Sequence, residues 1–277
     1  MKTQSIIQKL KNHSRKKQKI HQNTLTKYFQ ERFLYRLSQS TYKENFLLKG
    51  GALAYTISGE DSRHTRDIDF LINKLKDEQK NMRNIFAEIC KITVDDGVLF
   101  NTQDIKIDEI PKEGNYSGIR IRIEATLGKI TQQLQIDIGV GDHVTPGPQE
   151  IKYPTILDEL PAPILDAYST ESLISEKFNA MIDLGEFNSR LKDFYDIYIL
   201  VERCDKSVLK KAIKNTFKTR KTTIIKDHCV FQEQFYRNKN RITQWYIFLK
   251  KNQLGKLDFD DVHKKILDHL KPIYDAL

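Results

Sequence analysis

The stretch that decides the fold runs from Phe46 to Leu71 and reads FLLKGGALAYTISGEDSRHTRDIDFL. It opens with a short apolar run that ends at Gly50 and Gly51, after which residues 52–57 are mostly apolar. A strand, a tight glycine turn and a buried helix are the natural interpretation of this order. Two glycines also allow the backbone to approach a phosphate closely. The stretch is therefore suited to hold a metal-bound triphosphate.

The end of this stretch alternates in the manner of a half-buried strand. Ile68, Phe70 and Ile72 would point to one face. Asp67 and Asp69 would then share the opposite face. Mg²⁺ prefers oxygen ligands, usually one or two carboxylates with water and substrate phosphates, and a pair of such ions can clamp an in-line phosphoryl displacement. Because an Asp-x-Asp pair is more often a solvated strand face, a third carboxylate is needed to favour a metal site.

A candidate third carboxylate is Asp137. It lies on the polar side of an alternating segment, residues 134–140, and is preceded by a similar segment with Arg120 and Arg122 on its polar side. A neighbouring strand would bring Asp137 beside the two earlier aspartates and complete a set of three metal ligands. The alternative is that Asp137 pairs with Arg120 or Arg122 across the sheet.

The positive charge of the chain is concentrated in two segments. The net charge is +9, yet residues 1–40 contain ten Lys or Arg and one acid, and residues 206–226 contain eight Lys or Arg and no acid. This segregation suggests a polyanion held by both ends of the chain around an acidic centre that attracts cations. For either segment alone, a solvated helix face is an equally good explanation.

Composition also indicates the compartment. The three cysteines are far apart and form no CxxC motif, which argues for a reducing compartment and against a zinc site or a disulfide framework. The basic N-terminus is not followed by an apolar signal region, and no run approaches the roughly 18 apolar residues of a membrane helix. We expect a soluble, cytoplasmic protein with no membrane partner.

Proline content marks the expected domain boundary. Five of the seven prolines lie between residues 145 and 165, where no regular element is expected to persist. We expect a basic N-terminal helical segment over residues 1–40, a sheet-containing domain over residues 41–165 and a helical domain over residues 166–277. Residues 1–20 are polar with little periodicity, and a helix is expected over residues 76–91.

Two helices are expected to open the helical domain. Thr170 can cap the first, which would run to about Leu184 and has Lys177 inside one of its apolar rows. A lysine at the edge of a core needs an anion or room to extend to solvent. The second helix is expected over residues 188–201.

That second helix carries charged residues at every third position. Arg190, Asp193 and Asp196 could form a ladder along their own helix. Because helical hairpins can pack antiparallel, the same residues could instead face Lys177 and a nucleotide.

Five motifs occur in a specific order along the chain. They are residues 49–54 (KGGALA), 63–70 (RHTRDIDF), 135–139 (QIDIG), 175–180 (SEKFNA) and 188–198 (NSRLKDFYDIY). In order and spacing, over about residues 33–200, they resemble the motifs of the AbiEii-type nucleotidyltransferase toxins. This abortive-infection and type IV toxin–antitoxin family lies within the polymerase-β-like nucleotidyltransferase superfamily.

The resemblance implies an α+β fold, in which a polymerase-β-like nucleotidyltransferase domain with a mixed sheet is followed by a helical C-terminal domain. It implies a toxin paired with an antitoxin that transfers a nucleotide from an NTP, in some members onto tRNA. The expected catalytic residues are Asp67, Asp69, Lys177 and Asp193. The expected metal ligands are Asp67, Asp69 and Asp137. The expected nucleotide-binding residues are Gly50, Gly51, Arg63, Thr65, Lys177, Arg190 and Asp196.

The leading hypothesis is an enzyme that uses Mg²⁺ or Mn²⁺ to transfer NMP from an NTP to an RNA, with tRNA as the expected acceptor. The expected RNA-binding residues are Lys210, Lys211, Lys214 and Lys218. One alternative is transfer to a protein or a small molecule, which would leave the two basic segments without a use. Another is a nucleic-acid-binding module without catalysis, against which the intact aspartates argue.

Overall fold

The protein forms two compact units in the structure, a computed structural model that describes residues 2–73, 81–113 and 116–277. We call them the sheet unit and the helical unit. The described residues of the sheet unit belong to Met1–Thr56, His64–Gly141 and Gln149–Ala167. Those of the helical unit belong to Ile57–Arg63, Asp142–Pro148 and Tyr168–Leu277. Each unit is thus built from three separate segments of the chain.

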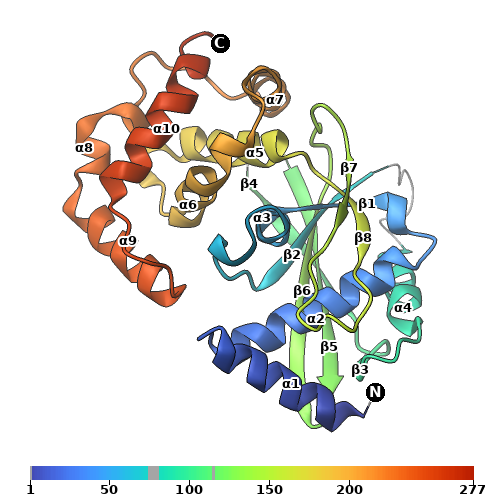
Figure 1. The fold of residues 1–277 in the computed structure, drawn as a ribbon. Helices are drawn as coiled ribbons and strands as arrows, with labels where there is room; N and C mark the ends of the chain where they lie inside the picture. Colours follow the sequence, from blue (N-terminus) through green and yellow to red (C-terminus); the bar gives the residue numbers. More distant parts are fainter. Residues whose placement is uncertain (1, 74–80, 114–115) are drawn as a thin grey trace. The chain divides into compact units, whose positions relative to one another are not determined.

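A mixed sheet forms the centre of the sheet unit (Figure 1). Within the described residues its strands are β1 (Phe46–Lys49), β2 (Asp67–Ile72), β3 (Val98–Phe100), β4 (Lys106–Glu113), β5 (Tyr116–Leu127), β6 (Ile130–Gly139), β7 (Gln149–Lys152) and β8 (Ile164–Ala167). Their order is β3-β5-β6-β2-β1-β8-β7, and β4 also pairs with β5. Strand β2 is parallel to β6 and antiparallel to β1.

The predicted strand, glycine turn and helix are confirmed. Strand β1 ends at Lys49, and helix α3 (Gly50–Ser58) begins at the next residue. Gly50 has a φ of 65°, a left-handed conformation that a side chain would disfavour. The sequence needs glycine here because the chain passes from strand to helix through this left-handed conformation.

One face of the sheet is covered by helices. The remaining helices of the sheet unit are α1 (Thr3–Lys16), α2 (His21–Ser38) and α4 (Met82–Lys91). Phe33 of α2 stacks on Phe86 of α4 at a centroid distance of 5.8 Å. Phe86 also contacts Phe46 of β1, which contacts Phe70 of β2. Since Phe70 points into this aromatic cluster, the alternating side chains Asp67 and Asp69 lie on the opposite face.

Two helical predictions in this unit have separate outcomes. Residues 3–16 form α1. The sequence shows little periodicity there because the buried row of this helix consists only of Ile6, Leu10 and Ser14. The helix predicted over residues 76–91 is present as α4, while residues 76–80 lie outside the described residues.

The prediction that no regular element persists between residues 145 and 165 is wrong. Strand β7 and the start of β8 lie there and pair antiparallel, and β8 also pairs with β1. Pro148 directly precedes β7 and Pro163 directly precedes β8. The prolines therefore stand outside the hydrogen-bonded ladder, where a missing N–H costs nothing.

The helical unit is formed by short helices around an aromatic core. Its helices are α5 (Thr170–Leu184), α6 (Leu191–Leu200), α7 (Lys206–Arg220), α8 (Glu233–Tyr236), α9 (Lys239–Lys251) and α10 (Phe259–Tyr274). Phe194 of α6 contacts Phe235 and Phe259 at 5.9 and 5.3 Å between ring centroids. The cap of α5 is Ser169 rather than the predicted Thr170, since the Ser169 hydroxyl accepts the N–H of Ser172.

The mixed sheet, together with these helices, confirms the predicted α+β fold class. None of the helices in the described part of the chain is long and apolar enough to cross a membrane.

Candidate metal centre and charged network

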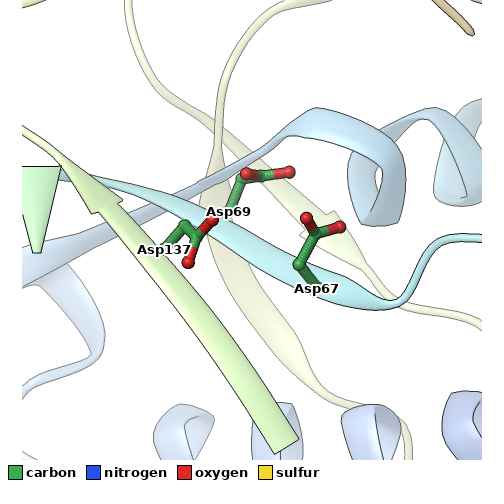
Figure 2. Close-up of side chains that lie close together, drawn as sticks. All are labelled: Asp67, Asp69 and Asp137. Atoms are coloured by element: carbon green, nitrogen blue, oxygen red, sulfur yellow. The ribbon is translucent and has the colours of Figure 1, made fainter. Parts of the chain in front are cut away.

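The three aspartates predicted as metal ligands lie together in the sheet unit. Figure 2 shows Asp67 and Asp69 projecting from β2 and Asp137 projecting from β6. Asp69 is directly opposite Asp137 in the parallel pairing of these strands. One carboxylate oxygen from each of the three residues lies within 4.8 Å of the other two, and all three side chains are half-buried. The carboxylates are therefore close enough to share a small cation.

The glycine turn holds one of these carboxylates in place. A Cβ atom added to Gly50 would lie 1.9 Å from Oδ2 of Asp69. Only a residue without a side chain allows this approach. On the other side of the cluster, the hydroxyl of Thr65 donates a hydrogen bond of 2.9 Å to Oδ1 of Asp67. Two residues assigned from sequence to the nucleotide thus contact the aspartates themselves.

Asp137 both lies beside the other aspartates and pairs with an arginine, so the proximity that a metal site requires and the arginine pairing occur together. Arg120 donates from Nε to Oδ1 of Asp137 at 2.8 Å and from Nη2 to Oδ2 at 2.7 Å. The hydrogen bond to Asp137 raises the pKa of Arg120, which burial alone would lower. Arg122, two residues further along β5, instead pairs with Asp108 of β4.

The strand register places a cation on either side of this acidic pair. Lys49 is opposite Asp69, Asp69 is opposite Asp137, and Asp137 is opposite Arg120. Sequence patterns alone indicate no role for Lys49, although it directly precedes the glycine turn. Its position beside Asp69 depends on the pairing of β1 with β2, which local sequence does not specify.

The donor atoms of this cluster suit a hard divalent cation. All three are carboxylate oxygens, the ligands that Mg²⁺ and Mn²⁺ prefer, and sulfur or imidazole ligands are not among them. The space around the cluster also suits a small cation, because the residue packed against the Asp69 carboxylate is a glycine and has no side chain.

A second cluster of the predicted site residues lies in the helical unit. Nζ of Lys177, on α5, is 2.9 Å from Oδ1 of Asp193 and 2.7 Å from Oδ2 of Asp196, both on α6. The lysine side chain is 8% exposed, and both aspartates are fully buried. The anion that a lysine in an apolar row requires is thus supplied by this pair of carboxylates.

Two arginines complete this network. Arg63 donates from Nε and Nη2 to the two carboxylate oxygens of Asp196, at 3.0 and 2.9 Å. Arg190 donates from Nε to Oδ2 of Asp193 at 2.6 Å. With Lys177, these contacts join three cations to two carboxylates. The side chain of Arg190 is 39% exposed, which leaves part of its guanidinium open to solvent.

The ion pairs change the pKa values of the buried groups. Burial raises the pKa of Asp193, but Lys177 and then Arg190 outweigh burial and lower it to about 2. Burial lowers the pKa of Lys177, but Asp193 and Asp196 outweigh it, so the pKa is raised. Asp193 and Lys177 are therefore both charged at neutral pH, and the network depends on the compensation between buried opposite charges.

The predicted RNA-binding lysines share one face of α7. Lys210, Lys211, Lys214 and Lys218 are all exposed. The buried residues of the same helix are Leu209, Ala212, Ile213, Thr216 and Phe217. The helix therefore has one side packed in the helical unit and another that presents cations to solvent.

The fold is similar to those of a nucleotidyltransferase toxin and of a second solved protein. The nucleotidyltransferase toxin MenT4 (Rv2826c) of Mycobacterium tuberculosis H37Rv is 13% identical with a TM-score of 0.56, and the match covers 100% of this chain and 98% of that chain. The protein JHP933 of Helicobacter pylori is 16% identical with a TM-score of 0.51, and 89% of each chain is covered. At such low identity these likenesses concern the fold alone.

No match was found among curated proteins. A family model described as the nucleotidyl transferase AbiEii toxin of type IV toxin–antitoxin systems matches residues 32–265. That range contains the three aspartates of the sheet unit, the charged network of the helical unit and the basic face of α7. Because the match extends over most of the chain, the protein belongs to the AbiEii nucleotidyltransferase toxin family.

Proposed function

We propose that this toxin transfers NMP from an NTP to an RNA acceptor, with tRNA as the expected RNA, and that a Mg²⁺ or Mn²⁺ ion at Asp67, Asp69 and Asp137 supports the transfer. Family membership already makes the protein a nucleotidyltransferase toxin with an NTP substrate and an antitoxin partner. The acceptor, the metal and the roles of individual residues belong to the proposal. The observation that carries it is the approach of three carboxylates against a glycine turn.

The sheet unit would hold the metal ion. A divalent cation there would neutralise charge that develops on the transferred phosphoryl group. Asp67 and Asp69 come from one strand and Asp137 from its neighbour, so the rigid sheet fixes their separation. Gly50 and Gly51 would let the backbone N–H groups at the start of α3 approach the triphosphate. No covalent nucleophile is required, because phosphoryl transfer depends mainly on positioning and charge neutralisation.

The charged network would bind or position the nucleotide. Within the helical unit, we assign Lys177 and Arg190 to anion binding and Asp193 to positioning, with Arg63 and Asp196 supporting them. A cluster of three cations that includes two guanidinium groups suits an anionic ligand. Among its cations Arg190 is the most exposed, and its planar guanidinium suits a phosphate group.

Two basic helix faces support an RNA acceptor. One is the α7 face described above. The other is on α1, where Lys11, Arg15 and Lys16 are exposed while Ile6 and Leu10 are buried. Both helices are held by their buried rows, so these cations are presented on ordered elements that can contact a phosphate backbone.

The acceptor is tested by incubating the protein with each labelled NTP, Mg²⁺ and total cellular RNA, and then separating RNA, protein and small molecules. We expect label in RNA, and none when the metal is chelated. Label confined to protein or small molecules would refute the RNA acceptor while leaving the nucleotidyltransferase activity intact.

The basic face of α7 is tested by changing Lys210, Lys211, Lys214 and Lys218 together to Gln. RNA binding should weaken, and the log–log dependence on salt should flatten by roughly 0.7 to 0.9 for each phosphate that the variant no longer neutralises. The matched control changes four exposed lysines of α9 and α10 in the same unit, namely Lys239, Lys250, Lys251 and Lys264. Equal salt dependence in the two quadruple variants would mean that the α7 face is only solvated.

A further inference from the structure

The strongest unassigned contact at the candidate metal centre is that of Arg120. Its guanidinium bonds both carboxylate oxygens of Asp137 in a two-pronged arrangement, at 2.8 and 2.7 Å. A carboxylate has about four lone-pair positions, and Gln135 donates a third, longer bond of 3.4 Å to Oδ2, so an acceptor position remains on Oδ1. Asp137 can therefore remain bonded to Arg120 and still offer an oxygen to a cation shared with Asp67 and Asp69.

Three carboxylates this close together repel one another. One oxygen from each lies within 4.8 Å of the other two, a distance at which like charges repel one another strongly. A positive charge bonded to one of them reduces this repulsion when no metal ion is bound. Arg120 supplies such a charge from a neighbouring strand of the same sheet, with its side chain 33% exposed and that of Asp137 15% exposed.

We propose that Arg120 is a positioning residue of the metal centre. It fixes the orientation of the Asp137 carboxylate toward Asp67 and Asp69, and it acts as a permanent counter-charge to the three acids. This inference rests on the proposed function, because it assigns Arg120 a role toward the ion that the aspartates would bind.

The chain provides a matched control for this role. Arg122 lies on the same strand and the same face, and it also pairs with an aspartate, Asp108. Asp108 belongs to β4 and is not among the three clustered acids, and its side chain is 53% exposed. An effect that depends on the metal centre should appear when Arg120 is changed and not when Arg122 is changed.

The proposed role predicts opposite changes in metal affinity and turnover. Removing a positive charge that is bonded to one of the ligands should tighten the binding of a doubly charged ion, by roughly tenfold for charges on the order of 6 Å apart in water-like surroundings. Removing the two-pronged bond should release Asp137 from its orientation, so kcat should fall roughly tenfold or more, since catalysis depends on the placement of the reacting groups. The KM for the NTP should stay within about twofold, because Arg120 is not assigned to the nucleotide.

The experiment compares wild type with Arg120→Gln, Arg120→Lys and Arg122→Gln. Mn²⁺ affinity is measured without substrate, from the electron paramagnetic resonance signal of the free ion, and transfer kinetics are measured separately. Arg120→Gln should bind Mn²⁺ more tightly and turn over more slowly. Arg120→Lys keeps the charge but not the planar fork, so its affinity should stay close to wild type while kcat falls. Arg122→Gln should match wild type in both measurements.

Other outcomes would overturn the inference. If Arg120→Gln matches Arg122→Gln in Mn²⁺ affinity and in kcat, Arg120 forms only a surface ion pair. Weaker Mn²⁺ binding by Arg120→Gln would refute the counter-charge, and unchanged kcat in Arg120→Lys would refute the orienting role even if the glutamine variant fails to fold. The proposed function fails separately, if the wild type and Asp69→Asn bind Mn²⁺ equally.

Discussion

Replacing Gly50 with alanine should displace Asp69 from the cluster of aspartates. The added Cβ would lie 1.9 Å from Oδ2 of Asp69, whereas an ordinary contact begins at about 3.4 Å. The carboxylate must therefore move by about 1.5 Å, or the turn must open by a comparable amount. A displacement of about 1 Å at a reacting centre can reduce the rate roughly a hundredfold, and we expect at least that loss of transfer.

The same substitution has a second cost that must be separated from the first. Gly50 has a φ of 65°, and an alanine in the left-handed region is destabilised by roughly 1 to 2 kcal/mol. Gly59 has nearly the same backbone conformation, with a φ of 60°, but no atom lies within 4 Å of its added Cβ. Gly59→Ala therefore introduces the strain without the collision.

The assay measures the free energy of unfolding, Mn²⁺ affinity and label transfer to RNA for both alanine variants. Both should lose roughly 1 to 2 kcal/mol of stability, and only Gly50→Ala should lose metal binding and transfer. The reasoning is refuted if the two variants retain the same metal affinity and the same transfer rate.

Further predictions concern the acids and the buried network. Asp67→Asn or Asp69→Asn should abolish transfer with little change in stability, and transfer near the wild-type rate would contradict the metal assignment. Expression of the wild type should slow growth, and Asp69→Asn should relieve this effect. Lys177→Met should cost roughly 3 to 5 kcal/mol in denaturant unfolding, because Asp193 and Asp196 lose a buried partner, whereas a change below about 1 kcal/mol would mean that the arginines suffice. The pKa of Asp193 is lowered to about 2 in the folded protein, so this carboxylate should contribute roughly 2 kcal/mol to the free energy of unfolding. That contribution should be present above about pH 4 and be lost as the pH falls toward 2. An equally steep loss of stability in Asp193→Asn would exclude this residue as the cause.

Local patterns in the sequence predict the elements of the candidate metal centre. Strand β1, the turn at Gly50 and the alternation of Asp67 and Asp69 depend on neighbouring residues, so periodicity and glycine chemistry are sufficient to find them. Alternation also places Asp137 on the polar face of its own strand. Its approach to Asp69 depends on the pairing of two strands that are far apart in the chain, for which the sequence offered only a hypothesis.

Features that depend on register or long-range contacts were not predictable in this way. The sequence offered Asp137 either a place beside the other aspartates or an arginine partner, and only the order of β5, β6 and β2 brings Asp137 beside both. The prolines indicated an irregular segment, but β7 and β8 are stabilised by each other and by β1. The buried row of α1 is too short to produce a clear period, and it becomes visible only when α1 packs into the core.

The interleaving of the two units along the chain imposes an order on folding during synthesis. The last segment of the sheet unit ends at Ala167, so that unit can close while much of the helical unit is still unmade. Arg63 is made early, yet its partner Asp196 follows 133 residues later. At roughly 5 to 20 residues per second, the ribosome needs about 7 to 27 seconds to deliver that partner. Asp137 is made before Asp196, so in the last part of this interval the nascent chain already contains all three clustered aspartates, while the segment carrying Arg63 waits for the helices that will bind it.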